Sequence, residues 1–189
     1  RKKSLRAFFL AMLAAQQAVV GSKETVMVSI RELTHEDGAA LAEMLNGDAL
    51  LRADLGIRMN QDITAGGVLR DIRKWCGLRT AVSYAILADG VTVGMISLSH
   101  IDPGSGTGCI GYWVGSSYRE HGYCKLAFKL VLHEARCQGL HTVSATIDNA
   151  NMASRKLWHG AGGSGTPVSA ESTRYEVRID RQQTNSADR

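Results

Sequence analysis

The sequence predicts an α/β (α+β) fold in which one mixed sheet carries helices on both faces. Two observations lead to this prediction. The 189 residues alternate between segments with the two-residue period of strands and segments with the helical period, in the order β α α β β β α β α β. Three consecutive strands form a meander and a strand-helix-strand crossover follows them, so antiparallel and parallel pairing meet in one sheet.

The N-terminal elements are a strand and two helices. Residues 26–31, VMVSIR, alternate well enough for a first strand. A helix follows at residues 34–47, with Thr34 as the expected N-cap and Gly47 as the stop. The pattern is weaker between residues 48 and 78, but apolar residues from Val68 onward recur at helical spacing and predict a second helix.

The meander comes next. Two apolar runs between residues 81 and 100 flank Asp89 and Gly90, a pair typical of two-residue hairpin turns. The runs are therefore expected to pair antiparallel. A loop of turn residues leads from there to a third strand of the meander, CIGYWVG, at residues 109–115.

The C-terminal elements form the crossover. A helix is expected at residues 122–139, and it ends at a glycine. HTVSATI, residues 141–147, reads as a strand. A helix at residues 149–162 is capped by Asn149 or Asn151, and residues 172–180 form a last alternating strand.

Composition narrows the function classes. The chain has 22 lysines and arginines against 18 acidic residues, a net charge of +4 that is spread without any block, which is too weak to indicate nucleic acid as a partner. The four cysteines form no C-x-x-C pair, so we interpret them as reduced thiols in a cytoplasmic protein. We expect no metal site and no membrane partner.

The two ends are set apart from the domain. Residues 1–25 combine a basic start with a short apolar run, as secretory signals do, and are too short to span a membrane. Because the rest of the chain has unpaired cysteines, an appended or alternative-start leader, helical or disordered, is favoured over a signal peptide. We expect one domain at residues 26–180 and a polar tail at residues 181–189.

The junction before the helix at residue 122 suits an anion. A helix start leaves about four backbone N–H groups unpaired and carries a partial positive charge of about half a unit. Gly122 has no Cβ to keep a phosphate from these amides, and Arg119 adds a charged contact at the rim. A simple tight turn would explain the glycine equally well, so the choice between a turn and an anion site depends on the neighbouring sequence motifs.

That context resembles the GNAT superfamily of N-acetyltransferases. Arg119 to Cys124 resemble its acetyl-CoA signature R/Q-x-x-G-x-G/A, and the preceding IGYWV looks like the fourth strand of the branch that acetylates the N-terminal alanine or serine of ribosomal proteins. NANMASRKLWHGAG is similar to the family's N-x-x-S-x-x-x-Y-x-x-x-G-F, with Asn151, Ser154 and Gly162 in place. The likeness covers about residues 26–180.

The resemblance implies a mostly antiparallel sheet of six or seven strands that splays between the fourth and fifth strands. Acetyl-CoA would be the cosubstrate, with its pantetheine arm in the splay and a backbone amide near Val114 polarising the thioester carbonyl. The acceptor would be a protein N-terminus or a small amine, and a homodimer is compatible with this. The implied cofactor-binding residues are Trp113, Val114, Gly115, Arg119, His121, Gly122, Tyr123, Cys124, Lys125, Asn151 and Ser154.

The sequence departs from the family where the catalytic groups are expected. Trp158 stands at the position of the usual tyrosine acid, Gly163 replaces a phenylalanine, and Gly108 and Cys109 supply no carboxylate on the fourth strand. Substitute catalytic candidates are His100, Tyr112 and Ser154.

Three readings of the function follow. The first is an acetyl-CoA-dependent N-acetyltransferase that acts on a primary amine by direct transfer. The second is a catalytically impaired acyl-CoA-binding sensor or partner module, which the absent tyrosine and carboxylate motivate. The third is a nucleotide-binding protein that uses the same glycine turn.

Overall fold

Seven strands form one sheet in the computed structural model of the protein, which describes residues 26–179. The predicted leader and the polar tail lie outside the described residues. The sheet order is β1-β2-β3-β4-β5-β7-β6, and only β4 and β5 pair in parallel. The strands are β1 (Val28–Glu32), β2 (Val82–Ala88), β3 (Val91–Asp102), β4 (Thr107–Val114), β5 (Thr142–Asp148), β6 (Ser164–Pro167) and β7 (Ser172–Arg178).

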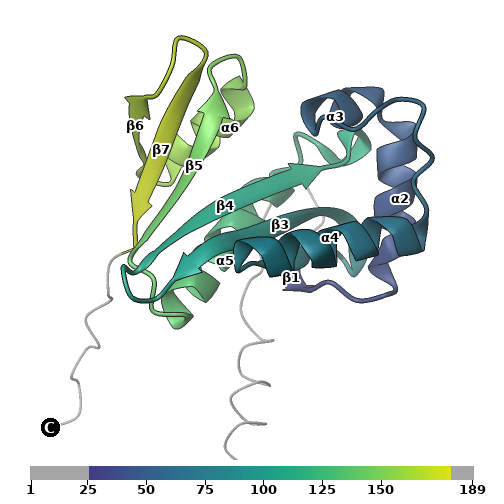
Figure 1. Ribbon diagram of the computed structural model, residues 1–189, viewed down its shortest axis with the longest axis horizontal. Coiled ribbons are helices and arrows are strands. Elements are labelled where there is room, and N and C mark those ends of the chain that lie inside the picture. Colours follow the sequence, from purple (N-terminus) through teal and green to yellow (C-terminus); the bar gives the residue numbers. More distant parts are fainter. Residues whose placement is uncertain (1–25, 180–189) are drawn as a thin grey trace, which may run out of the picture.

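Helices lie on both faces of this sheet (Figure 1). They are α2 (Asp37–Gly47), α3 (Ala49–Asp54), α4 (Ala65–Arg79), α5 (Tyr123–Cys137) and α6 (Met152–Gly160). Helices α2 and α4 contact β3 on one face, here called the α4 side. Helices α5 and α6 pack on the opposite face, here called the α5 side. The predicted fold class is confirmed.

The main core lies on the α5 side. Phe128 of α5 and Trp158 of α6 are fully buried there, and their ring centroids are 5.0 Å apart. Ile110 and Val114 of β4 belong to the same cluster, and Tyr112 packs against it. Because side chains alternate across a strand, the residues between these three face the α4 side. Trp113 does so, since it packs against the smaller cluster of α2, α3 and α4.

The hairpin turn and the long helix follow the predictions. Asp89 and Gly90 connect β2 to β3 with φ angles of 47° and 82°, which are the positive values that a two-residue hairpin turn needs. Gly139 follows α5 with φ of 82° and ends it in a left-handed conformation. Asn151 caps α6, because its side chain accepts a hydrogen bond from the amide of Ser154 at 3.0 Å.

Other local predictions were wrong or incomplete. Thr34 does not cap α2, which begins at Asp37; the Asp37 carboxylate instead accepts hydrogen bonds from the Thr34 amide at 2.8 Å and from Arg31. Helix α3 was not predicted, although Asp48 caps it by accepting from the amide of Leu51 at 2.8 Å. The short strand β6 was not located either, because its residues, SGTP, carry no strand pattern.

Within residues 26–179, no helix is both long and apolar enough to cross a membrane. The four cysteines all lie in this part of the chain, and none of them forms a disulfide.

Candidate functional site

Strands β4 and β5 separate along most of their length, as the resemblance implied. They pair at Thr107 with Thr142, Gly108 with Val143 and Cys109 with Ser144, and at no later position within the described residues. Figure 1 shows β5, together with β7 and β6, diverging from β4 beyond this point. Five further residues of β4, from Ile110 to Val114, therefore keep β3 as a neighbour but have no partner on the other side.

Tyr112 and Val114 direct their backbone groups toward this open side. The amide of Gly115 donates to the carbonyl of Val93 at 3.0 Å, so Gly115 points toward β3. In an antiparallel ladder successive residues alternate in direction, and Val114 and Tyr112 consequently point away from β3. The open edge thus offers the N–H groups of Tyr112 and Val114 and the C=O group of Tyr112 to an extended ligand, while the C=O group of Val114 accepts a hydrogen bond from Arg119. The amides of Trp113 and Gly115 face β3.

Helix α5 begins beside this edge with backbone amides that have no acceptor. Its N-cap, Gly122, has φ of 77° and makes no side-chain cap, and the first helical bond runs from the amide of Leu126 to the carbonyl of Gly122 at 3.2 Å. The amides of residues 123–125 make no hydrogen bond with any part of residues 26–179. Glu120 also has a positive φ of 66°. Left-handed residues spaced in this way form a concave nest of N–H groups that binds anions.

The side chains at this junction frame the nest. The Nε of Arg119 donates to the carbonyl of Val114 at 3.4 Å, which holds the guanidinium against the open edge. The ring of His121 stacks on Tyr123, with centroids 5.2 Å apart, and its Nδ1 donates to the carbonyl of Arg119 at 2.7 Å. Burial raises the pKa of the Cys124 thiol to about 12. Because this thiol packs toward the core, only the backbone amide of Cys124 is available to an anion.

Three polar groups gather on the α5 side of the open edge, those of Tyr112, Ser154 and Trp158. Burial raises the pKa of Tyr112 to about 12, while hydrogen bonding with the nearby Ser154 and Trp158 acts to lower this pKa. The phenol oxygen of Tyr112 and the indole nitrogen of Trp158 are both buried, and within residues 26–179 neither has a partner at normal hydrogen-bond geometry, so their contacts with each other and with Ser154 are weak. Buried polar groups are normally paired, so an unpaired phenol and an unpaired N–H beside an open strand edge indicate a site for a polar ligand.

Residues of α6 and β3 complete the predicted set. Asn151 and Ser154 lie in the first turn of α6, where the Asn151 side chain caps the helix through the amide of Ser154. His100 lies at the far end of β3, with its ring 3.3 Å from Arg79 and 3.2 Å from Ser99. The structure therefore brings Tyr112 and Ser154 together and places His100 elsewhere, beside the C-terminus of α4.

Two further groups near the site were missed from the sequence. Asp48 caps α3 and also accepts a hydrogen bond from the amide of Ser116 at 2.9 Å, so it ties α3 to the loop after β4. Arg174 of β7 donates to the hydroxyl of Ser144 at 3.0 Å, beside the last pair of β4 and β5. An Asp before a helix is a readable N-cap signal, but the contact of Arg174 depends on strand order, which no local pattern shows.

No group of metal-ligating side chains is assembled anywhere in residues 26–179.

Comparisons with known proteins agree with this geometry. The family model for the acetyltransferase (GNAT) domain matches residues 28–164. Among solved structures, RimL, a ribosomal L7/L12 alpha-N-protein acetyltransferase in complex with coenzyme A, is similar at a TM-score of 0.66 and 20% identity, over 81% of this chain and 94% of that chain. None of the curated proteins matches the chain.

Two other similar structures differ in what they bind. Spermidine N-acetyltransferase from Vibrio cholerae, in complex with coenzyme A and spermine, has a TM-score of 0.67 and 10% identity, over 80% of this chain and 95% of that chain. The structure of yncA from Salmonella typhimurium with its cofactor acetyl-CoA has a TM-score of 0.61 and 21% identity, over 85% and 99% of the two chains. These likenesses establish the fold, and the family model covers well over half of the sequence. The chain therefore belongs to the GNAT acetyltransferase family.

Proposed function

We propose that the protein is an acetyl-CoA-dependent N-acetyltransferase that moves an acetyl group directly to a primary amine. One observation carries the proposal: the open edge of β4 at Tyr112 and Val114 lies beside the unpaired amides at the start of α5. An extended arm that ends in a diphosphate would satisfy both sets of backbone groups at once.

The residues present fit coenzyme A. The amides of Gly122 to Lys125, with Arg119 and His121 at the rim, would hold the diphosphate, because their N–H groups lack other acceptors. The backbone of Val114 would pair with the pantetheine arm, and Trp113 and Gly115 would keep that edge in place through their bonds to β3. Asn151 and Ser154 would line the arm from α6.

Acetyl-CoA supplies a thioester, whose C–S bond is replaced by a C–N bond to the amine while the departing sulfur takes up a proton. The backbone N–H of Tyr112 or Val114, which faces the open side, would stabilise the charge that develops on the carbonyl oxygen. An alkyl ammonium has a pKa near 10 and a peptide α-amine one near 8, so the acceptor must first lose a proton.

Tyr112 is the group that we assign as proton donor in place of the absent tyrosine of α6. The phenol is protonated at neutral pH and its hydroxyl is buried beside the open edge, although burial, by raising its pKa to about 12, makes it a weaker acid. Ser154 and the indole N–H of Trp158 are placed to support the phenolate that forms when the proton leaves. His100 is the weaker candidate, because its ring contacts Arg79 and Ser99.

The acceptor is a protein N-terminus or a small-molecule amine, since both kinds occur among the acceptors named for similar structures. The unpaired cysteines favour a reducing compartment, and we place the reaction in the cytoplasm. A homodimer stays a prediction.

A second candidate function is an acyl-CoA-binding module without turnover. The observation that favours it is Trp158, which stands where relatives carry the tyrosine and which is fully buried against Phe128.

Calorimetry and thiol release separate these functions. We expect coenzyme A to bind the protein, ATP and NAD to bind much more weakly, and free thiol to appear when acetyl-CoA is mixed with a library of primary amines. Binding of coenzyme A with no thiol release from any amine would support the binding module instead. Absence of coenzyme A binding would contradict both proposals.

A further inference from the structure

A polar row crosses the α4 side of the sheet where β4 and β5 separate. Cys109 of β4 lies opposite Ser144 of β5, and Ser144 lies opposite Glu176 of β7. Neighbouring strands are about 4.8 Å apart. The carboxylate of Glu176 therefore lies two strands away from Cys109, the residue after which the open edge of β4 begins. Val143 and Val177 belong to the core on the α5 side, and the residues next to them therefore face the α4 side.

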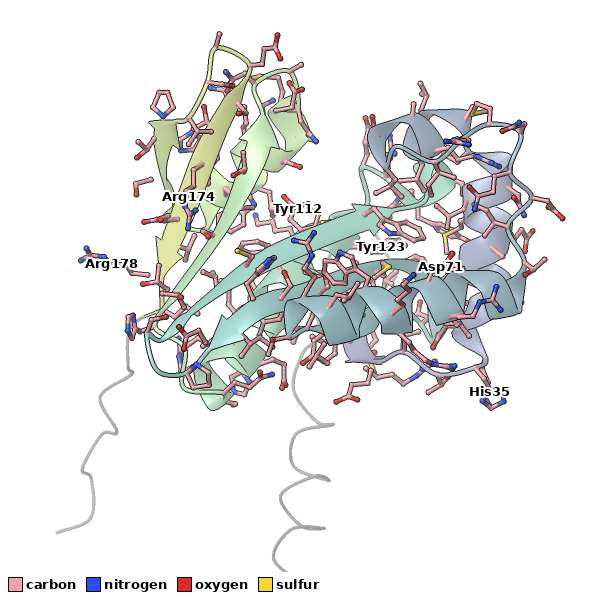
Figure 2. The ribbon with its side chains drawn as sticks, in the orientation of Figure 1. His35, Asp71, Tyr112, Tyr123, Arg174 and Arg178 are labelled. Atoms are coloured by element: carbon pink, nitrogen blue, oxygen red, sulfur yellow. The ribbon has the colours of Figure 1, made fainter. Side chains whose placement is uncertain are left out.

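Arg174 is held over this row at two points. Its Nη2 donates to the hydroxyl of Ser144 at 3.0 Å, and its Nε donates to the carboxylate of Glu176 at 3.1 Å. Ser144 is only 4% exposed, whereas the side chains of Arg174 and Glu176 are each 50% exposed. The guanidinium is thus anchored on a buried hydroxyl and still faces solvent (Figure 2).

Most of the hydrogen-bonding capacity of Arg174 remains unused. A guanidinium has five N–H donors in a planar fork that matches a carboxylate. One Nε–H and one Nη2–H are accounted for, and the remaining donors make no hydrogen bond with residues 26–179. The middle of β4 is also open on this face, because Gly111 is exposed although it lies on a central strand.

Charge on this face argues against a polycation. Arg174, Glu176 and Arg178 alternate along β7 on the α4 side, while the facing residues of β5 are uncharged hydroxyl residues. Beside the open edge, the charge of Arg174 is matched by the carboxylate of Glu176 with which it pairs, and Arg178 lies farther along β7, opposite Thr142. A carboxylate that approached the open edge from this side would meet the unused N–H donors of Arg174, whereas a polyamine would meet a carboxylate, Glu176, that is already paired with this guanidinium.

We propose that Arg174, anchored by Ser144, is an acceptor-binding residue that recognises a carboxylate near the reacting amine. The acceptor is then a primary amine that carries an acidic group, such as a peptide with an acidic residue next to its N-terminus, and not a polyamine. This inference rests on the proposed function, because it places the acceptor opposite the edge that coenzyme A would occupy.

Matched acceptors test the assignment. The tripeptide amides Ala-Glu-Ala, Ala-Gln-Ala and Ala-Lys-Ala share one α-amine and differ in one charge. We expect the wild-type protein to favour the Glu peptide over the Gln peptide by about tenfold in kcat/KM, the value of one charge-assisted hydrogen bond, and to use the Lys peptide and spermidine least. Arg174→Glu should invert the order, and Arg174→Gln should abolish the preference.

Two controls keep the outcome clear. Arg178→Gln removes a cation from the same face of β7, but opposite Thr142, where β4 and β5 are still paired, so it should leave the order of the peptides unchanged. Calorimetry gives a readout without turnover: the Glu peptide should bind the coenzyme A complex of Arg174→Gln about tenfold more weakly than that of the wild type, while the affinity for coenzyme A itself stays the same.

The outcomes separate this inference from the proposed function. If coenzyme A binds and amines are acetylated, but spermidine is preferred or the Arg174 variants keep the wild-type order of peptides, the acceptor site is refuted and the acetyltransferase stands. If coenzyme A does not bind the wild-type protein, the proposed acetyltransferase function and the acceptor-binding role of Arg174 are both refuted.

Discussion

Replacing Gly122 with valine tests the anion nest at the start of α5. Gly122 has φ of 77°, and a side chain in this left-handed region costs on the order of 1–2 kcal/mol of folding free energy. If the amides of residues 123–125 hold the diphosphate, we expect a branched side chain at this position to obstruct it. Loss of one charge-assisted hydrogen bond to these amides is worth about 1.5–3 kcal/mol, so the Kd for coenzyme A should rise roughly 10- to 100-fold.

The same helix provides a matched control. Gly139, at the other end of α5, has φ of 82°, and a Cβ added there would meet no atom within 4 Å. Gly139→Val should therefore carry a similar backbone strain, measured by thermal unfolding, with no change in affinity for coenzyme A. Calorimetry on both variants checks the prediction. If Gly122→Val binds coenzyme A as tightly as Gly139→Val does, the nest is not the diphosphate site.

Three other predictions follow from the described contacts. Tyr112→Phe should lower kcat at least about tenfold and leave the Kd for coenzyme A unchanged; an unaltered rate of the chemical step in rapid-quench experiments would exclude Tyr112 as the proton donor. Trp158→Phe removes a buried N–H but leaves a cavity where the fully buried indole packs against Phe128, so the free energy of unfolding should fall by about 1–3 kcal/mol. Turnover should change only a few-fold, and a larger loss of turnover would give Trp158 a direct role. Asp37→Asn should lower the free energy of unfolding, measured in urea at pH 7, by about 2–3 kcal/mol, because charged hydrogen bonds to Arg31 are lost. An unchanged urea midpoint would contradict this.

The pH dependence of stability follows from the same carboxylate. Burial works to raise the pKa of Asp37, but hydrogen bonds from Arg31, Thr34 and Thr92 outweigh it and lower that pKa below its ordinary value. A lowered folded-state pKa means that Asp37 contributes its stabilisation above about pH 4 and loses it as the pH falls through the folded-state value. Wild-type stability should therefore fall in this range more steeply than that of Asp37→Asn.

The features that local chemistry determines could be predicted from the sequence. Asp89 and Gly90 make the hairpin turn because their backbone tolerates positive φ, and Gly122 begins α5 for the same reason. Each of these positions is set by its own residue and its immediate neighbours. The order of the elements, apart from α3 and β6, was also predicted, and the separation of the fourth and fifth strands was predicted through the family resemblance.

The features that depend on register could not be predicted in this way. Ser144 and Arg174 are thirty residues apart in sequence, and their contact exists only because β7 inserts between β5 and β6. Thr34 was assigned as a cap from its residue type alone. In the structure the Thr34 amide donates to the carboxylate of Asp37, and the helix begins at Asp37, three residues later. In both cases a long-range or competing hydrogen bond decides the outcome.

Backbone hydrogen exchange at Tyr112 and Val114 is the most direct test of the central claim, which is that an extended arm of coenzyme A pairs with the open edge of β4. The amides of both residues face the side without a strand partner, so they should exchange rapidly in the protein alone and become protected by at least about tenfold when coenzyme A is added. Exchange at these two amides that stays the same at saturating coenzyme A would contradict the account.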